Sequence, residues 1–447
     1  MSRSEISSFD TLLANRANAP VGVKKLAGAL PWLKAYSRAS SELWLSEGLP
    51  TKRNEAWKYT NIAALAENEI TLARPATLAA APLGILRQPD SLAELVFVNG
   101  RFSSELSNFS PEKNGVHIQL LSQTGPENAL EELARFSSAS LKNQTVFGAL
   151  NFELSEEAVL IRITKSAVVA QQPITVYYLS SGSDEMAFQM ATPRIYVYSE
   201  KMSEAALLEV YGAGNNRHFM TNAVTDLVLD EGARLSHCKL QIEGPETYHF
   251  SQTQAELGRG SWLETHQVSL GAKLSRHDLS VRLNGEAAEA VVNGLYIVQN
   301  EQHVDNHTSI EHVLGNTVSS QLYKGILDDR SRAVFNGRVW IHQDAQKANA
   351  VQLNKNLLLS AKAEVDSKPE LEIYADDVKA SHGATVGQMD AEQLFYFQTR
   401  AVDQQTAERM IALGFAQDVV FSMKNEALKK RVSPFIEEKF FSLGARK

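Results

Sequence analysis

A short phrase that recurs in the second half of the chain constrains the fold more than any other feature. The phrase starts with leucine, continues through three small or turn-forming residues and then Ala or Ser, and ends on an apolar residue. Copies begin at Leu229, Leu257, Leu327 and Leu359, and a looser copy begins at Leu283. The intervals of about 26 to 44 residues are uneven, but they fall in the range that is typical of stacked structural repeats.

Each copy is interpreted as a sharp corner between two β-strands. Its leucine would be buried against the leucine of the turn beneath, while polar side chains alternate outward. After about residue 156 the chain is rich in Val, Ile and Tyr, which favour strands. No long helical pattern interrupts them, which argues against a doubly wound α/β fold. We therefore expect a mainly β fold with a parallel β-helix core; a β-sandwich with similar turns is the alternative.

Helical patterns flank the expected β-helix. Apolar residues recur at helical spacing from about residue 10 to 49, with Pro31 as an early helical residue, and again over 125–140. Between these segments, Asn99 and Gly100 suit the tight turn of a β-hairpin. The expected organisation is a mostly helical region over 1–150, a β-helix core over 151–395 and a C-terminal helical region over 396–447.

The C-terminal helical region carries an apolar stripe that begins after Asp390. Spacing of three and four residues favours packing on the protein's own core over binding a partner, which is the alternative. The members of the stripe are Leu394, Phe397, Ala401, Met410, Ile411, Leu413, Phe415, Val419 and Val420.

Composition excludes several classes of function. A net charge of -8 argues against a nucleic-acid partner, because binding to phosphates needs clustered Lys and Arg. The chain has no run of about 18 apolar residues that would span a membrane, and its polar first residues lack the apolar stretch of a signal peptide. We therefore expect a cytoplasmic protein that binds neither nucleic acid nor membrane.

Motifs for two common kinds of catalysis are missing. The sequence has no phosphate-binding loop ending in Gly-Lys-Ser/Thr and no Gly-x-Ser-x-Gly elbow, so neither ATP hydrolysis nor serine-based hydrolysis is expected. Two acidic pairs, Asp328 with Asp329 and Asp376 with Asp377, could serve glycoside chemistry only if both carboxylates faced one groove. Neighbours in a strand point to opposite faces, so we expect both pairs at corners.

Two further candidates for chemistry lie in the strand region. His303, Asp305 and His307 would share one face of a strand, where they could bind a divalent metal ion, but a polar outer face of the β-helix is the favoured interpretation. The single cysteine, Cys238, alternates with apolar Leu240, which predicts a buried, structural thiol rather than a reactive one.

Two segments carry a specific resemblance. Residues 332–402, which include "ASHGATVGQMD", closely resemble the C-terminal half of the SufB/SufD family of iron-sulfur cluster assembly scaffolds. Residues 53–65, "RNEAWKYTNIAAL", resemble the Arg-x-Glu-x-Trp-Lys-Tyr-Thr signature of the SufD branch of that family. The resemblance implies a right-handed parallel β-helix flanked by N-terminal and C-terminal helical regions.

The resemblance also implies a role for His382. This residue matches a family position at a subunit junction, where it would be a transient iron or cluster ligand or a proton relay, presented by tight backbone at Gly383 and Gly387. Some relatives have a cysteine two residues earlier, where this chain has Ala380, so His382 is left as the ligand at this spot. The alternative is that His382, with Ser381 and Thr385, only hydrogen-bonds a corner of the β-helix. No catalytic residue is expected.

Partners and cofactors follow from the same resemblance. A SufB-like paralogue would pair with this chain as a heterodimer, and a SufC-like ABC ATPase would bind the C-terminal helices around residues 394–421 and supply ATP hydrolysis. No cofactor would be stably bound to the isolated chain, and an iron-sulfur cluster would be transient in the complex. The expected function is a non-catalytic scaffold subunit for cluster assembly. The alternatives are a carbohydrate-active β-helix enzyme and a homodimeric scaffold, since the isolated chain could also form a homodimer.

Overall fold

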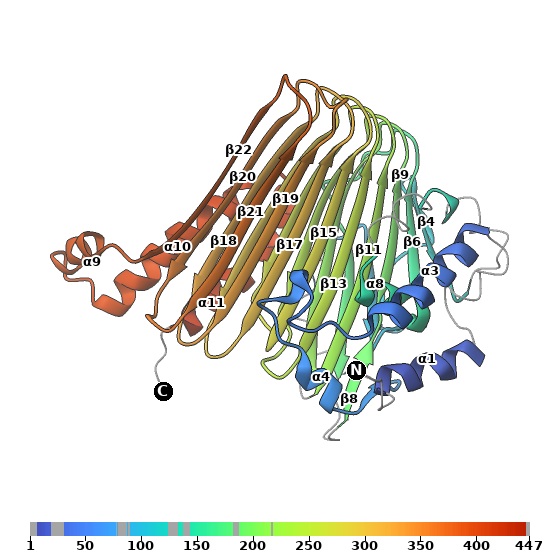
Figure 1. The fold of residues 1–447 in the computed structure, drawn as a ribbon, viewed down its shortest axis with the longest axis horizontal. Helices are drawn as coiled ribbons and strands as arrows, with labels where there is room; N and C mark the ends of the chain where they lie inside the picture. The colour runs from blue at the N-terminus through green and yellow to red at the C-terminus, as the bar shows by residue number, and fades with distance from the viewer. Residues whose placement is uncertain are drawn as a thin grey trace.

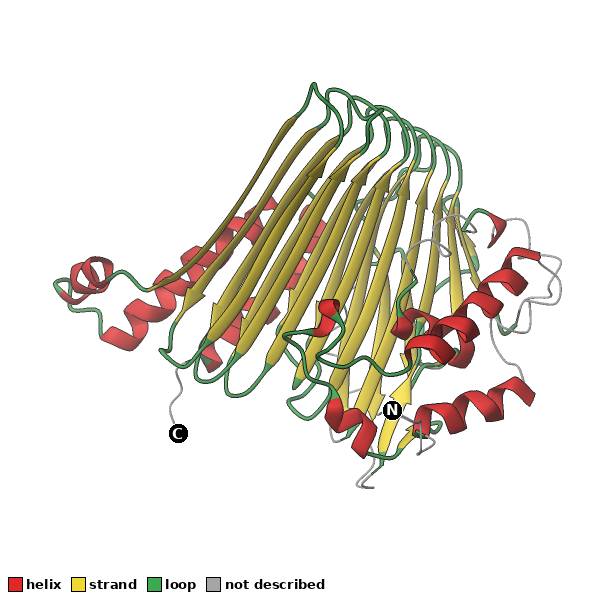
Figure 2. Ribbon diagram, viewed as in Figure 1, coloured by secondary structure: helices red, strands yellow, loops and turns green. Residues whose placement is uncertain are grey.

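The computed structural model describes residues 7–18, 31–76, 78, 87, 90–123, 133–136, 144–181, 187–215 and 218–443. Two long sheets form a flattened solenoid, with short helices at its N-terminal end and two long helices along one face (Figures 1 and 2). Consecutive strands of the central region alternate between the two sheets, and their partners within each sheet are parallel. This is the arrangement of a parallel β-helix, which confirms the predicted fold class and excludes the antiparallel β-sandwich.

Each turn of the solenoid contributes one strand to each sheet. Sheet A contains, from the C-terminal end, β21 (Glu364–Ile373), β19 (Arg332–Ile341), β17 (His303–His312), β15 (Leu274–Leu283), β13 (Tyr248–Leu257), β11 (Phe219–Leu229), β9 (Arg194–Ser199), β6 (Ala158–Ile163), β5 (Val116–Leu120) and β4 (Glu112–Lys113). Off this path, β8 (Phe188–Ala191) pairs with β11, and β1 (Ile70–Leu72) pairs with β8. Sheet B contains β22 (Lys379–Gln388), β20 (Asn349–Leu358), β18 (Val318–Leu327), β16 (Glu289–Val298), β14 (Trp262–Ser269), β12 (Arg234–Gln241), β10 (Glu204–Asn215), β7 (Ile174–Ser181), β2 (Ala93–Val98) and β3 (Arg101–Phe102).

The recurring leucines mark the corners, as predicted, but they belong to two different corners. Leu229, Leu257 and Leu283 are register partners in sheet A and are fully buried between the sheets. Leu327 lies at the end of a sheet B strand instead, where the nitrogen of Leu359 donates to its carbonyl oxygen. With two strands per turn, both corners use the same sequence chemistry, so the sequence pattern did not separate them.

Helices cover the outer faces of the solenoid near its N-terminal end and along sheet B. On sheet A, α1 (Ser8–Asn18), α3 (Pro31–Glu47), α4 (Ala63–Glu67), α8 (Val146–Leu154) and the 3-10 turn η1 (Glu55–Trp57) carry or adjoin two apolar clusters. On sheet B, α10 (Gln404–Ser422) and α11 (Glu426–Ser442) pack on the outward row that contains Cys238. The short α9 (Ala391–Gln398) extends away from the solenoid (Figure 1).

Several local predictions are confirmed. Pro31 is the first residue of α3, and the Asn99–Gly100 turn, with both φ angles positive, joins antiparallel β2 and β3. Most of the helix expected over 125–140 lies outside the described residues. The strands β2 and β5 precede residue 151 and join the sheets, so this region contains strands as well as helices. The division into three regions stays a prediction.

The C-terminal apolar stripe is not continuous. Ala401 adopts a positive φ of 60° between α9 and α10, which separates the first members of the stripe from the rest. None of the residues of α9 is buried, whereas α10 buries Val419 and Val420 against sheet B. Within the described residues, no helix has both the length and the apolar character needed to cross a membrane.

Candidate functional site

The C-terminal edge of the solenoid is open. Among the described strands, β22 pairs only with β20 and β21 pairs only with β19, so one side of each terminal strand has no backbone partner. Exposed apolar side chains lie at this end, namely Ile373, Tyr374 and Val386. An unpaired, partly apolar strand edge is a template for pairing with another chain, and soluble proteins rarely leave one uncovered.

His382 lies in the middle of β22, on the face that points into the solenoid. Its register partner is Gln352, and the partner of Gln352 is Gln321. Both glutamines are fully buried between the sheets, whereas His382 is exposed because no further turn covers it. The imidazole therefore stands at the mouth of the interior, beside the unpaired backbone.

The neighbours of His382 differ from the sequence expectation. Ser381 and Thr385 lie on the outer face of the same strand, opposite His382, and none of the three is at a corner. Gly383 and Gly387 lie in extended backbone rather than in a tight turn, since neither has a positive φ. The cluster of small residues suggested a turn in the sequence, but pairing with β20 holds this segment as an extended strand.

A row of buried amide side chains, Gln352 and Gln321, continues inward from His382 and is called the amide file below. Gln352 Nε2 donates to Gln321 Oε1 at 2.7 Å, and Gln321 Nε2 donates to Thr308 Oγ1 at 2.7 Å. Gln352 Oε1 is buried and has no hydrogen-bond partner in the described part of the chain. Thr308 comes from sheet A, so the file joins the two sheets.

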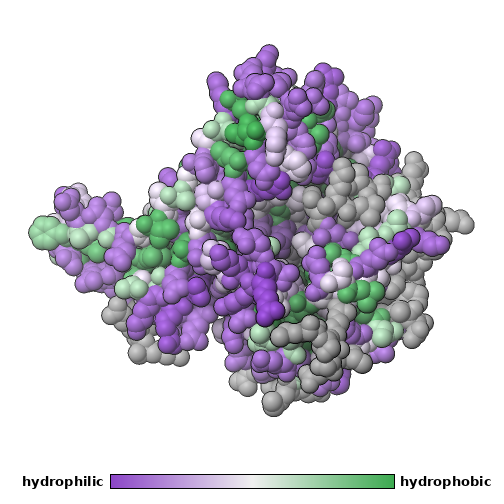
Figure 3. All heavy atoms as spheres, viewed as in Figure 1, coloured by the Kyte–Doolittle hydropathy of each residue, from purple (hydrophilic) through white to green (hydrophobic). Residues whose placement is uncertain are grey.

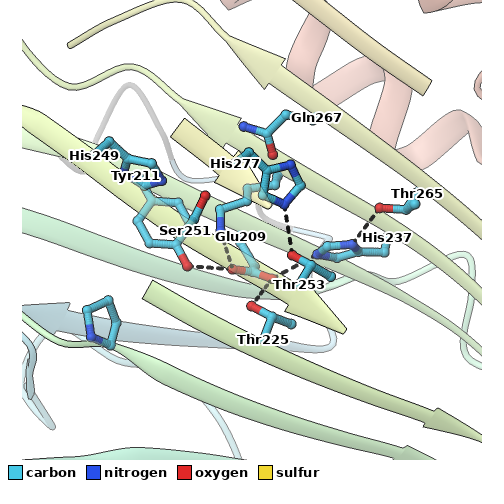
Figure 4. A network of polar contacts seen from close by, with 12 residues as sticks. Glu209, Tyr211, Thr225, His237, His249, Ser251, Thr253, Thr265, Gln267 and His277 are labelled. Carbon is cyan, nitrogen blue, oxygen red and sulfur yellow. Dashed lines mark hydrogen bonds and ion pairs between the residues drawn. The ribbon is translucent and has the colours of Figure 1, made fainter. Parts of the chain in front are cut away.

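Deeper in the interior lies a buried polar network centred on Glu209 (Figure 4). The Glu209 carboxylate accepts hydrogen bonds from Tyr211 Oη at 2.5 Å and Thr225 Oγ1 at 2.8 Å, and lies 2.8 Å from His237 Nε2. Burial alone would raise the pKa of Glu209, but the charge of Lys239 and the His237 contact lower it to about 2. The carboxylate is therefore ionised although it is completely buried.

Two further groups of the same network have perturbed pKa values. Lys239 Nζ lies 4.0 Å from Glu209 Oε2, and burial lowers the pKa of this ammonium. His277 Nε2 lies 3.1 Å from Thr253 Oγ1, while burial lowers the pKa of His277 well below its usual value and keeps the ring neutral. The prediction that polar side chains alternate outward does not hold for this network, because strand alternation alone does not reveal partners from the opposite sheet.

Strand β17 anchors the N-terminal signature. Thr60 Oγ1 donates to Asp305 Oδ2 at 2.6 Å and lies 2.9 Å from His303 Nε2, while His307 Nε2 lies 2.9 Å from Asp305 Oδ1. Burial alone would raise the pKa of Asp305, but the Arg276 guanidinium and His307 lower it far below its usual value. This face is thus the outer face of sheet A, as favoured, and its polar groups hold residues 56–60.

The remaining sequence candidates have structural positions. Cys238 is fully buried with Leu240 beneath the C-terminal helices, and burial raises the pKa of its thiol. The two acidic pairs, at 328–329 and 376–377, lie in corners between strands, as predicted. Over the residues that the structure describes, no group of three or more His, Cys, Asp or Glu side chains could hold a metal ion.

The C-terminal helices present a second exposed surface. Phe395 and Tyr396 of α9 are mostly exposed, and Arg400 stacks on the ring of Tyr396 at 3.7 Å. Lys324 of β18 fixes the following helix, α10, because its Nζ donates to the carboxylate of Asp418 and to a backbone carbonyl of the helix. Figure 3 shows apolar surface on this protruding part of the molecule.

Comparison with known proteins agrees with this architecture. Residues 178–415 match the family model described as "SUF system FeS cluster assembly, SufBD core domain". The chain is 33% identical to iron-sulfur cluster assembly protein SufD of Escherichia coli over 396 residues, which is 87% of this chain and 88% of that protein.

Two further relatives come from a cyanobacterium and a plant. An iron-sulfur cluster assembly SufBD family protein of Synechocystis is 30% identical, with 88% of each chain covered. Protein ABCI7, chloroplastic, of Arabidopsis thaliana is 30% identical over 90% of this chain and 85% of that protein. Since the family model covers more than half of the sequence and the relatives match it over most of their length, the chain belongs to the SufBD family of iron-sulfur cluster assembly proteins.

Proposed function

We propose that this chain is a non-catalytic scaffold subunit for iron-sulfur cluster assembly, and that His382 contacts iron or the nascent cluster at a junction with a SufB-like paralogue. The observation that carries the proposal is the open edge of β22, where an exposed imidazole stands beside unpaired backbone. Family membership supplies the class of cargo, since the relatives are named for cluster assembly.

The edge supports pairing with a similar solenoid. A second β-helix with an open edge could continue the sheets through main-chain hydrogen bonds, while Ile373, Tyr374 and Val386 would supply apolar contact. Such pairing would bury His382 between the two chains. The same geometry could accept a second copy of this chain, so the oligomeric state belongs to the test.

His382 supplies one ligand for the cargo. A neutral imidazole is a suitable ligand for iron, and it can complete a cluster whose other ligands are thiolates. This chain's own thiol, Cys238, is buried in a different part of the solenoid. In the proposed complex the thiolates are therefore contributed by the partner chain.

The C-terminal helices would bind the ATPase that supplies energy. Phe395 and Tyr396 form an exposed aromatic pair on α9, a helix that buries none of its own residues, and aromatic side chains are favoured in protein interfaces. We assign this surface, with the adjacent α10, to a SufC-like ATPase. Nucleotide-driven movement of the ATPase would then be transmitted to the solenoid through the Lys324–Asp418 contact.

The test is anaerobic co-expression with SufB-like and SufC-like chains, followed by measurement of iron and acid-labile sulfide in the purified complex. His382→Ala should leave assembly of the complex intact but reduce its cluster content. Ser381→Ala is the matched control, because it alters the adjacent exposed residue on the opposite face of β22. Unchanged cluster content in His382→Ala would overturn the assigned role of His382, and a chain that purifies alone as a homodimer carrying a cluster would favour the homodimeric scaffold.

A further inference from the structure

The amide file behind His382 has a defined polarity. Gln321 uses its Nε2 to reach Thr308 and therefore presents its Oε1 to the next turn, where Gln352 Nε2 occupies it. The amide of Gln352 uses its Nε2 for this hydrogen bond, so its acceptor, Oε1, remains available for a further donor. The next residue in this register row is His382.

That acceptor is one of the buried polar atoms that the fold leaves unpaired in the part of the chain that the structure describes. Gln352 is fully buried, and within the described residues its Oε1 receives no hydrogen bond. Buried polar atoms in folded proteins are nearly always paired, because an unpaired one loses its hydration without compensation. The row of side chains therefore needs one more donor, at the position where the solenoid ends.

His382 is placed to be this donor. Register partners in adjacent strands lie about 4.8 Å apart, and side chains of one row share a face of the sheet. A ring N–H of His382 can therefore reach Gln352 Oε1 after rotation of its side chain, which is free to turn because it is exposed. Covering of the edge by a partner would exclude water and favour this internal hydrogen bond over hydration.

We propose that Gln352 is a positioning residue, which accepts the N–H of one ring nitrogen of His382 and directs the other nitrogen out of the open edge toward iron. The inference rests on the proposed function and adds how the ligand is prepared. Histidines that bind metals generally donate their other ring N–H to a carbonyl or carboxylate, which fixes the tautomer and the ring orientation. A glutamine carbonyl whose amide is held by the hydrogen bond from Gln352 Nε2 to Gln321 Oε1 meets this need.

The experiment is an anaerobic titration of the apo complex with ferrous iron alone, for four variants of this chain. Gln352→Met fills a similar volume without an acceptor and should weaken iron binding by about 10-fold to 100-fold, the range found for partners of metal ligands. Gln352→Glu keeps an acceptor oxygen and should remain within a few-fold of the wild type. Gln321→Met is the matched control: it breaks the same file one turn further from His382 but leaves the Gln352 acceptor in place, so it should weaken iron binding less than Gln352→Met does.

A second readout separates positioning from general damage. With ring-labelled ¹⁵N-histidine, the His382 resonances of the apo complex should report one tautomer in the wild type, a mixture in Gln352→Met and a smaller loss of tautomer preference in Gln321→Met. Thermal unfolding of each complex checks that the variants are folded. If Gln352→Met and Gln321→Met weaken iron binding equally, the file is structural only. If neither does, Gln352 Oε1 holds only water.

The titration also tests the positioning role of Gln352 separately from the proposed function. His382→Ala should weaken iron binding at least as much as Gln352→Met. If His382→Ala binds iron as the wild type does, the proposed function fails. If His382→Ala weakens binding and Gln352→Met does not, only the positioning role of Gln352 fails.

Discussion

Arg276 on β15 and Asp305 on β17 form a buried ion pair beneath the N-terminal signature, with Arg276 Nη1 2.7 Å from Asp305 Oδ2. The guanidinium also stacks on the ring of Trp57, at 3.9 Å from its centroid, and donates to the carbonyl oxygen of Ala56 at 2.7 Å. One arginine thus connects two turns of the solenoid to residues 56–57. The Arg-x-Glu-x-Trp-Lys-Tyr-Thr motif is therefore explained as a clamp on the outer face of sheet A.

Asp305→Ala should destabilise the protein by about 3 kcal/mol, because it leaves a buried guanidinium with one partner fewer and removes the acceptor of Thr60. This loss of stability lies at the lower end of the range for a broken buried ion pair, because Arg276 keeps its ion pair with Asp278. Equilibrium unfolding in urea measures the change, and limited proteolysis should show faster cleavage in residues 52–61. Glu301→Ala, which breaks an exposed ion pair, is the control and should cost less than about 1 kcal/mol. Equal losses would refute the clamp.

His312 makes a second prediction, about pH. It occupies the interior row otherwise formed by Leu283 and Ile341, and its two ring nitrogens lie 2.8 Å from Thr317 Oγ1 and Ser319 Oγ. Burial lowers the pKa of His312 from 6.5 to about 4. As pH falls from about 6.5 to 4, His312 becomes protonated in the unfolded chain but stays neutral in the folded chain. The free energy of unfolding therefore decreases over this pH range, by about 3 kcal/mol for this residue.

Two substitutions test this. His312→Leu restores the apolar row and His312→Gln keeps a polar side chain, and neither titrates, so both should flatten the dependence of the free energy of unfolding on pH between about 6.5 and 4. Chemical denaturation at several pH values provides the measurement. Curves for both variants that run parallel to the wild-type curve would show that His312 is not a source of acid sensitivity.

The general architecture could be predicted from the sequence because each turn of a solenoid must bury its own residues. Leu229 and Leu257 signal corners locally, and the alternation around Cys238 correctly places it with Leu240 on a buried face. Such features depend only on chain neighbours and on the strand period. The acidic pairs at corners were predicted for the same reason.

The interior polar groups could not be predicted in this way. Glu209 is satisfied by His237, which is 28 residues away, and by Thr225 from the opposite sheet. Strand alternation assigns a side but not a partner, so a buried carboxylate in a strand looks like an outward-facing one. The prediction of the surroundings of His382 was wrong for a related reason. The sequence does not show that His382 lies next to Gln352, because that requires the register between β20 and β22.

The attachment of α10 to the solenoid depends on Lys324. Its Nζ donates to Asp418 and to the carbonyl oxygen of Phe415, and the ammonium lies 4.2 Å from the centroid of the Phe415 ring. Lys324→Ala should increase amide hydrogen exchange in α10 while the strands stay protected, because the helix loses its polar anchor but the ladders do not change. Lys355→Ala, the register partner on β20, is the control and should leave α10 unchanged. Faster exchange throughout the sheets would instead indicate global destabilisation.

The open edge gives the last prediction. Val386 faces the interior on β22, at the open edge, and is half exposed, so Val386→Lys would place a charge where a partner strand would dock in the proposed complex. The substitution should abolish or strongly weaken pairing with a SufB-like chain, and any self-association of the isolated chain, while its own unfolding free energy changes by less than about 0.5 kcal/mol. Sedimentation velocity measures both kinds of association.

The matched control is Val351→Lys on the outer face of β20, which is similarly exposed but lies on a strand already paired on both sides, and it should associate as the wild type does. If Val386→Lys still pairs normally and Val351→Lys does not, the interface lies on the outer face of sheet B rather than at the open edge.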